Sequence, residues 1–201
     1  RYRDPIIDDK TLCIYISQSG ETADTIAALK LAKTKGAKTL AVSNVIGSSI
    51  TREADYTIYT HAGPEIAVAS TKAYTSQVVL LVMLAIYFAE ILDSTSANVL
   101  NDLKADILDL PVKIETILDQ LEPIKDFAKK VYTQKDMFFL GRGTDYNVAL
   151  EGSLKLKEIS YIHSEAYASG ELKHGPIALI ENGVTVVSIL TDPSLVEKSI
   201  S

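Results

Sequence analysis

Short apolar runs alternate with helical sequence along this chain, and this alternation restricts the folds open to it. Strands are predicted at about 11–17, 38–45 and 55–60, and helices at about 21–35 and 71–92. Strands joined through helices run parallel, because a helical connection returns the chain to the same edge of the sheet. The pattern therefore predicts an α/β fold with a parallel sheet that helices cover on both faces.

A second strand–helix unit is predicted nearer the carboxyl terminus. The run DMFFLGRGTD at 136–145 opens with a strand, and a helix is expected over about 146–162. Residues 163–176, HSEAYASGELKHGP, are expected to be irregular, and residues 184–190 to form another strand. Each half thus contains a strand, a turn rich in Gly or Ser and a helix start, as a duplicated fold would.

The polar stretch DSTS at 93–96 marks a predicted boundary. Helical sequence follows through Lys130, with an interruption expected near Pro111 because proline lacks the N–H that a continuous helix uses. The chain has no initiator Met, and only a short tail follows its last predicted strand, so we expect a part of a longer protein. The predicted segments are the end of a first domain (1–93), a helical linker (94–130) and the start of a second domain (131–201).

Composition argues against several classes of function. Hydrophobic residues make up 47% of the 201 residues, enough for a sizeable core, and the formal charge of −6 argues against a general nucleic-acid surface. The longest apolar run, 78–89, is shorter than the roughly 20 residues of a membrane crossing and is predicted to be a buried core helix. The single Cys13 is predicted to fill core space in a reducing compartment.

Polar side chains gather where the first strand becomes a helix, at Ser17, Gln18, Ser19 and Thr22, and Gly20 among them lets the backbone approach a ligand closely. Parallel α/β sheets bind ligands beyond the carboxyl ends of their strands, and a helix N-terminus there offers N–H groups to an anion. The stretch lacks the lysine of a GxxxxGK[ST] loop and the GxGxxG pattern, so it favours a single phosphate over a nucleotide polyphosphate. Helix capping by the same Ser and Thr side chains is the alternative interpretation.

Three stretches of the sequence resemble a known family. ISQSGETADT resembles the phosphate-binding turn of sugar isomerase (SIS) domains. Residues 42–77 and 149–176 resemble the isomerase part of the glutamine–fructose-6-phosphate aminotransferase family, the glucosamine-6-phosphate synthases. The similarity covers essentially the whole chain. It implies two flavodoxin-like three-layer α/β/α units with parallel sheets, both incomplete in this chain.

The resemblance assigns substrate-binding residues to the first unit. Val68 and Ser70 match residues that contact the sugar, and Ser70 also stands at a predicted helix start, where an N-cap role is the plain alternative. The phosphate of a hexose 6-phosphate is expected on four residues that match the family without a change: Ser17, Gln18, Ser19 and Thr22.

The predicted acid–base chemistry lies in the second unit. Glu151, Lys155 and Glu158 are spaced i, i+4 and i+7 on one helical face, a pattern that by itself is typical of a solvated ion-pair face. The resemblance implies instead that Glu158 moves a proton between C1 and C2 of the sugar, with Lys155 assisting at the hydroxyls. His174, in GELKHGP, matches a histidine that helps to open the sugar ring, which an imidazole titrating near pH 7 can do.

The resemblance also implies partners. His174 would reach the active site of a partner subunit in a homodimer. Ammonia would come from a glutaminase domain of the same parent chain that is absent here, and Cys13 does not match its nucleophile. The carboxyl-terminal tail with the lysine that forms an imine is absent as well. No cofactor is expected, the scattered His61, His163 and His174 give no metal-ligand spacing, and the expected location is the cytoplasm.

The function predicted from the resemblance is conversion of fructose 6-phosphate, with ammonia from glutamine, to glucosamine 6-phosphate by ketose–aldose isomerisation. The main alternative is a non-enzymatic SIS module that senses a phosphosugar. Such a module needs the turn at Ser17–Thr22 but has no use for Glu158 and His174 together. A related isomerase or deglycase acting on another amino-sugar phosphate is the third possibility.

Overall fold

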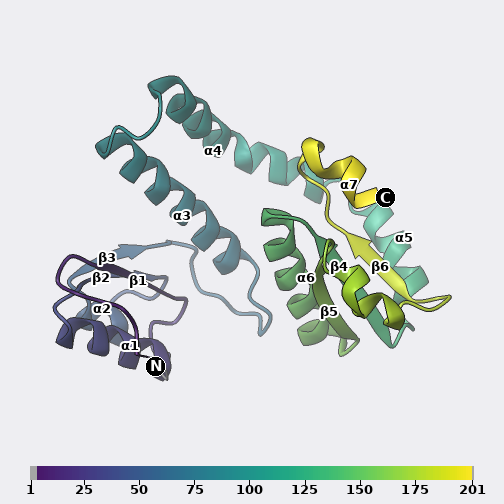
Figure 1. Cartoon of the computed structure of the whole chain (residues 1–201), viewed down its shortest axis with the longest axis horizontal. Helices are drawn as coiled ribbons and strands as arrows, with labels where there is room; N and C mark the ends of the chain where they lie inside the picture. Colours follow the sequence, from purple (N-terminus) through teal and green to yellow (C-terminus); the bar gives the residue numbers. More distant parts are fainter. Residues whose placement is uncertain (1–3, 201) are drawn as a thin grey trace. The chain divides into compact units, whose positions relative to one another are not determined.

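The computed structural model describes residues 4–200, apart from the side chain of Ile200. The chain divides into two compact units, one ending at Lys113 and the other beginning at Ile114, so that the division falls inside helix α4 (Ala97–Leu118). Each unit contains a three-stranded parallel sheet (Figure 1). The α/β class predicted from the alternation of strands and helices is confirmed.

The sheet of the first unit consists of β1 (Leu12–Ser17), β2 (Lys38–Ser43) and β3 (Tyr56–Tyr59), in that order. The central β2 is the most buried of the three, as expected for a strand paired on both sides. Ser17 at the end of β1 pairs in register with Ser43 at the end of β2. The residues that follow these two strands therefore emerge at the same edge of the sheet.

Helices α1 (Ala23–Thr34) and α2 (Ser49–Glu53) pack on this sheet and form its core. Leu29 of α1, Ala41 of β2 and Ile50 of α2 are fully buried and in contact. Burying a leucine or isoleucine side chain completely stabilises a fold by about 1.5–3 kcal/mol. The two large side chains of this cluster thus hold both helices against β2.

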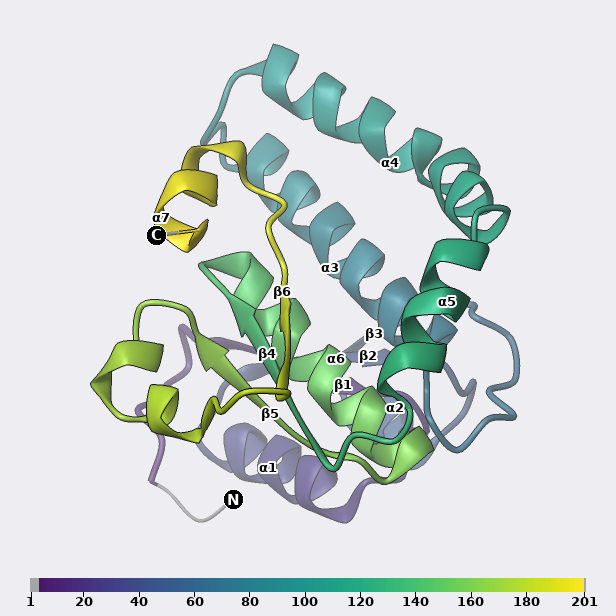
Figure 2. The ribbon, with the colours of Figure 1, turned by 90° about the vertical axis from the view of Figure 1, so that its right-hand side faces the viewer.

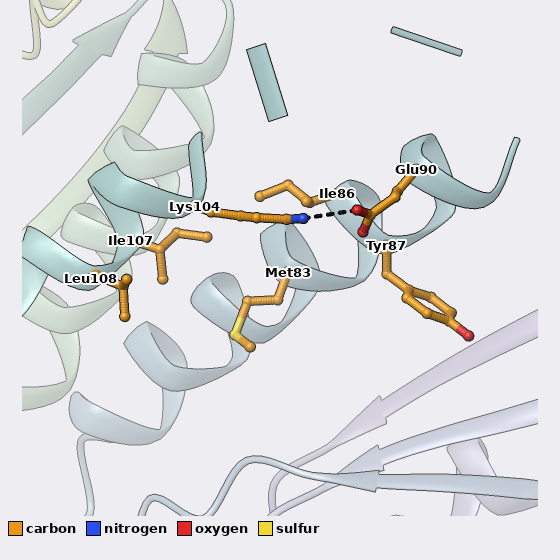
Figure 3. A pocket seen from close by; sticks show the side chains of 7 residues that line it. All are labelled: Met83, Ile86, Tyr87, Glu90, Lys104, Ile107 and Leu108. Carbon is orange, nitrogen blue, oxygen red and sulfur yellow. Dashed lines mark hydrogen bonds and ion pairs between the residues drawn. The ribbon is translucent and has the colours of Figure 1, made fainter. Parts of the chain in front are cut away.

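Helix α3 (Lys72–Ile91) lies beside α4 in the first unit (Figures 1 and 2). Between them is an apolar groove of about 330 Å³, bordered by an ion pair of 3.0 Å between Lys104 Nζ and Glu90 Oε1 (Figure 3). The apolar side chains that line it are Met83, Ile86, Tyr87, Ile107 and Leu108.

The prediction that residues 78–89 form a buried core helix is wrong for the described chain. Only Ala73 and Ile86 of α3 are buried, while Met83 and Tyr87 are exposed. An apolar sequence indicates that a helix should bury a face, but it does not say against which partner. By length and composition α3 is also the one helix among residues 4–200 that could cross a membrane. Core helices of soluble proteins meet the same criterion, so we do not assign α3 as a membrane span.

The interruption expected near Pro111 is also wrong, because α4 continues through it to Leu118. A proline removes one backbone hydrogen bond and strains the preceding turn, yet α4 runs through Pro111 as one helix of 22 residues. The helix ends instead just before α5 (Glu122–Val131), where Pro123 occupies the first turn. A proline costs little there, because the first N–H groups of a helix have no partner within it.

The sheet of the second unit has β4 (Asp136–Gly141) at its centre, between β5 (His163–Ala168) and β6 (Thr185–Ser188) (Figure 2). Helix α6 (Thr144–Ser160) packs against β4 and β5. The prediction that residues 163–176 are irregular is wrong for the first part, since β5 pairs with β4 along its whole length. HSEAYA is too polar to be recognised as a strand from its sequence, and it becomes one by pairing with β4.

The second unit is completed by short helices. They are η1 (Leu172–His174), η2 (Pro176–Leu179), η3 (Pro193–Leu195) and α7 (Val196–Ile200).

Asp145, in the first turn of α6, ties that helix to the segment after β6. Its carboxylate accepts a hydrogen bond from the Thr191 N–H at 2.8 Å and another from the Thr191 hydroxyl. The hydroxyl and the N–H of Thr191 together hold the pKa of Asp145 below its usual value, although burial opposes them. The folded state therefore favours the ionised carboxylate.

The substitution Asp145→Asn should lower the urea midpoint of unfolding at pH 7, because the amide cannot accept both bonds as a carboxylate does. A depressed carboxyl pKa contributes stability that is present above the unfolded-state pKa and is lost as the pH falls through the folded-state pKa. The difference in urea midpoint between wild type and variant should therefore become smaller as the pH falls toward 3, below the usual Asp pKa of about 3.9. Asp126→Asn, on the exposed side of α5, is the control. An equal difference in urea midpoint at pH 7 and pH 3 would contradict a stabilising role for the ionised Asp145 carboxylate.

Candidate functional site

The turn between β1 and α1 has its shape fixed by internal hydrogen bonds. The Gly20 N–H donates to Ser17 Oγ at 3.0 Å, and the Glu21 N–H donates to Ser19 Oγ at 3.2 Å. Ser17 Oγ and Thr22 Oγ1 are 3.3 Å apart, within hydrogen-bond distance. Ser17 is buried, with 6% of its surface exposed. The structure thus gathers the hydroxyl groups that the sequence placed here into one ordered turn.

Helix capping does not explain these hydroxyl groups. Thr22 is the N-cap residue of α1, but its side chain makes no capping hydrogen bond. Ser17 and Ser19 accept bonds from N–H groups of the turn itself. The first N–H groups of α1 therefore receive no hydroxyl cap from Thr22, and an anion at this position would satisfy them.

Backbone bonds attach the turn to the segment that follows β2. The Asn44 N–H donates to the Gln18 carbonyl at 3.1 Å, and the Ile50 N–H donates to the Gly20 carbonyl at 2.9 Å. The side chain of Asn44 extends the connection, since its Oδ1 accepts from the Ala62 N–H at 2.9 Å. Sequence reasoning missed Asn44. Its position just after β2, at the edge where β1 also ends, was the available signal.

Glu21 makes the second connection between the two segments. Its carboxylate accepts a hydrogen bond from the Ser49 N–H, at 2.8 Å, at the start of α2. Hydrogen bonds from the Ser49 hydroxyl and N–H lower the pKa of Glu21, with a smaller contribution from the charge of Arg52. The carboxylate of Glu21 is therefore engaged by the start of α2 and joins the turn to that helix.

The predicted sugar-contacting residues lie on the segment before α3. Val68 is fully exposed, and the Ser70 hydroxyl donates to Glu65 Oε2 at 3.2 Å. The same carboxylate oxygen accepts from the Ala73 N–H at 3.3 Å, whereas the N-cap residue Thr71 makes no side-chain bond. Burial acts to raise the pKa of Glu65, but these hydrogen bonds outweigh it and the pKa is lowered. Glu65 thus caps α3, and the N-cap role considered for Ser70 is wrong.

In the second unit, Lys155 lies between two carboxylates on one face of α6. Its Nζ is 3.6 Å from Glu151 Oε1 and bonds directly to Glu158 Oε2. The hydrogen bond to Glu158 is the main reason that the pKa of Lys155 is raised. His174 is exposed at the end of η1, and among residues 4–200 no hydrogen bond or ion pair joins it to Glu158. The geometry shown is an ion-pair network, which a catalytic role for Glu158 also allows.

The remaining histidines offer no metal centre. His163 Nδ1 is 2.9 Å from Asp136 Oδ1, across the pairing of β5 with β4. Within the described part of the chain no three His, Cys, Asp or Glu side chains are grouped so that they could hold a metal ion.

Comparison with known proteins identifies the family. The family described as SIS domain matches residues 1–87 and 130–198, which include the turn at Ser17–Thr22 and the whole of α6. The chain belongs to the SIS-domain family. The predicted membership of the SIS-domain family is therefore confirmed.

The individual relatives that this SIS-domain chain resembles have a more specific description than the family. It is 60% identical over 201 residues to a glutamine–fructose-6-phosphate aminotransferase [isomerizing] of Clostridium perfringens, and 53% identical over 196 residues to one of Thermococcus kodakarensis. The chain spans about a third of the length of these curated relatives, 33% in both cases. Among solved structures it resembles the C-terminal domain of glucosamine-fructose-6-phosphate aminotransferase from Francisella tularensis. The TM-score is 0.95 at 39% identity, covering 98% of this chain and 56% of that one.

Substitution of Gly20 tests how closely the turn packs against Ser48 at the start of α2. Its φ is +69°, and an added Cβ would lie 2.0 Å from Ser48 Oγ. Gly47 has a similar φ of +72° but no heavy atom within 4 Å of the same position. Gly47→Ala should therefore lose about 1–2 kcal/mol of unfolding free energy from backbone strain alone. Gly20→Ala should lose more in urea unfolding because Ser48 must also move, and an equal loss in both variants would show that the turn is not packed against α2.

Proposed function

We propose that this SIS-domain chain is the isomerase part of a glutamine–fructose-6-phosphate aminotransferase. The parent protein would convert fructose 6-phosphate and glutamine-derived ammonia to glucosamine 6-phosphate. The observation that carries the proposal is the ordered turn at Ser17–Thr22, with the start of α1 not capped by Thr22, in a chain 60% identical to an enzyme of that name. A turn that only capped the helix would use its hydroxyl groups to accept hydrogen bonds from the first N–H groups of α1.

The phosphate of the substrate would occupy the turn. The oxygens of Ser17 and Ser19 already accept N–H bonds, so their hydroxyl hydrogens can be directed at a phosphate oxygen. Gln18 and Thr22 would supply further neutral donors. Because no lysine or arginine belongs to the turn, binding would rest on aligned dipoles and hydrogen bonds rather than on a paired charge.

Isomerisation would use the acid–base residues of the second unit. Ammonia would first condense with the C2 carbonyl of the open ketose, with loss of water, to give an imine. Glu158 would then take the proton from C1 and return it at C2, while the O1 proton passes to the nitrogen, so that the imine becomes an amine and C1 becomes an aldehyde. Lys155, kept protonated by its raised pKa, would donate hydrogen bonds to the sugar oxygens on which charge develops. His174 would move the proton that opens the ring, a task suited to an imidazole. Val68 and Ser70 would contact the sugar.

The resemblance extends the proposal to partners. A homodimer in which His174 serves the partner's site, and a glutaminase domain elsewhere in the same parent protein, would complete the enzyme in the cytoplasm. A phosphosugar sensor would use the turn but would have no need of the Lys155–Glu158 pair.

Ser19→Ala should weaken binding of fructose 6-phosphate by about 1.5–3 kcal/mol, since one hydrogen bond to a charged group is lost. Calorimetry on the chain measures this change. Fructose without phosphate is the matched control, because it should be insensitive to the substitution. Unchanged affinity for fructose 6-phosphate would remove the turn from the phosphate site.

Glu158→Gln should strongly slow isomerisation while substrate still binds. The test uses a chimera in which this chain replaces the matching third of the Clostridium perfringens relative. Loss of a general base lowers turnover by about 10²–10⁴-fold, measured here as formation of glucosamine 6-phosphate. Glu151→Gln is the control, because Glu151 also faces Lys155 but has no assigned step. Normal turnover in the Glu158 variant would exclude it as the base.

A further inference from the structure

The second unit contains a cavity of its own at the carboxyl ends of its strands. Its volume is about 350 Å³, and it lies beside Leu140 near the end of β4, where Arg142 follows that strand and Ser169 and Gly170 follow β5. Parallel α/β sheets bind ligands at this edge, as the turn in the first unit would. Nothing in the proposed isomerisation uses this cavity.

The charge of the cavity is opposite to that of the chain. The chain as a whole carries −6, yet the charged residues that line the cavity are all cationic and none is acidic. Ser169 adds a hydroxyl group, whereas that of Ser199 already bonds to Arg142 and to the Leu195 carbonyl, and Leu172 and Ile177 give the cavity apolar walls. The polar members of the lining are Arg142, Ser169, Lys173, Lys198 and Ser199.

Arg142 is held in one orientation at this site. Its Nη2 donates to the Lys198 carbonyl at 2.7 Å, and its Nε donates to Ser199 Oγ at 3.2 Å. The remaining nitrogen, Nη1, faces Gly170, where an added Cβ would lie only 3.3 Å away. A guanidinium that is already oriented loses little further freedom when it binds an anion. Glycine at position 170 keeps the approach to Nη1 open.

We propose that this cavity binds the phosphoryl group of a small phosphorylated metabolite. Arginine presents a planar set of donors that suits phosphate oxygens, and Lys173 adds a compact positive charge beside it. A volume of about 350 Å³ exceeds what one phosphate needs, so the rest of the ligand can lie against the apolar walls. Unlike the neutral turn of the first unit, this site acts through full charges, so its affinity falls with ionic strength.

Amide-resolved NMR of the ¹⁵N-labelled chain tests the site with inorganic phosphate, exchanged for chloride at constant ionic strength. The amides of residues 141–143 and 169–173 should shift and saturate. Lys173→Gln should weaken this response at least five-fold, and Gly170→Ala should weaken it too. Lys130→Gln, the same charge change on the exposed end of α5, should alter it less than two-fold. Fructose 6-phosphate in place of phosphate then shows whether a sugar is tolerated.

The experiment separates this site from the turn. Ser19→Ala should reduce shifts at residues 18–22 and leave those at 169–173 unchanged, so that either assignment can fail alone. Arg142→Gln would also remove the hydrogen bonds that Arg142 makes to α7. The test therefore relies on the variants at Lys173 and Gly170. Absence of saturable shifts at 141–143 and 169–173, or equal weakening by Lys130→Gln and Lys173→Gln, would overturn the proposal.

Discussion

One hydrogen bond joins the core of the first unit to its candidate site. Ile50 is fully buried against Leu29 and Ala41, and its N–H donates to the Gly20 carbonyl at 2.9 Å. The side chain that fixes α2 on the sheet therefore also fixes the turn that would hold a phosphate. A site whose backbone is anchored in a packed core needs little reorganisation to bind, because its donors already point in fixed directions.

The two units differ in the groups that they offer to a bound anion. The first gathers hydroxyl groups, an amide and a helix N-terminus at the end of β1, with no cationic side chain in the turn. The second places Arg142 and Lys173 at the end of its strands and keeps Lys155 on α6 between two carboxylates. The same architecture thus carries one neutral dipolar environment and two charged ones, and their chemistry follows from side chains rather than from the fold.

Local patterns predicted the regular elements well where an apolar run decided them. The strands β1 and β2 and the helices α1 and α6 follow from short apolar runs or helical spacing. β5 was missed because HSEAYA becomes a strand only through pairing with β4, which is a non-local effect. The burial of α3 was overestimated for a related reason, since an apolar helix sequence does not show which element the helix packs against.

Prediction of the site had the same limit. The turn residues and the Glu158 and His174 candidates came from motifs that are contiguous in sequence. Asn44, Glu21 and Glu65 were missed, because each acts through a contact with a residue at least five positions away along the chain. Such supporting residues become visible only once strands and loops are placed beside one another.

The close approach of Gly20 to Ser48 has a consequence for how these sequences can diverge. Any side chain at position 20 would meet both the Cβ and the Oγ of Ser48, so the residues tolerated at one position depend on the other. Removal of the Ser48 side chain would relieve these two contacts, while a third at 3.0 Å from Ser43 Oγ and the backbone preference at position 20 would remain. The two positions are therefore epistatic, and substitutions that are harmful singly can become acceptable in pairs.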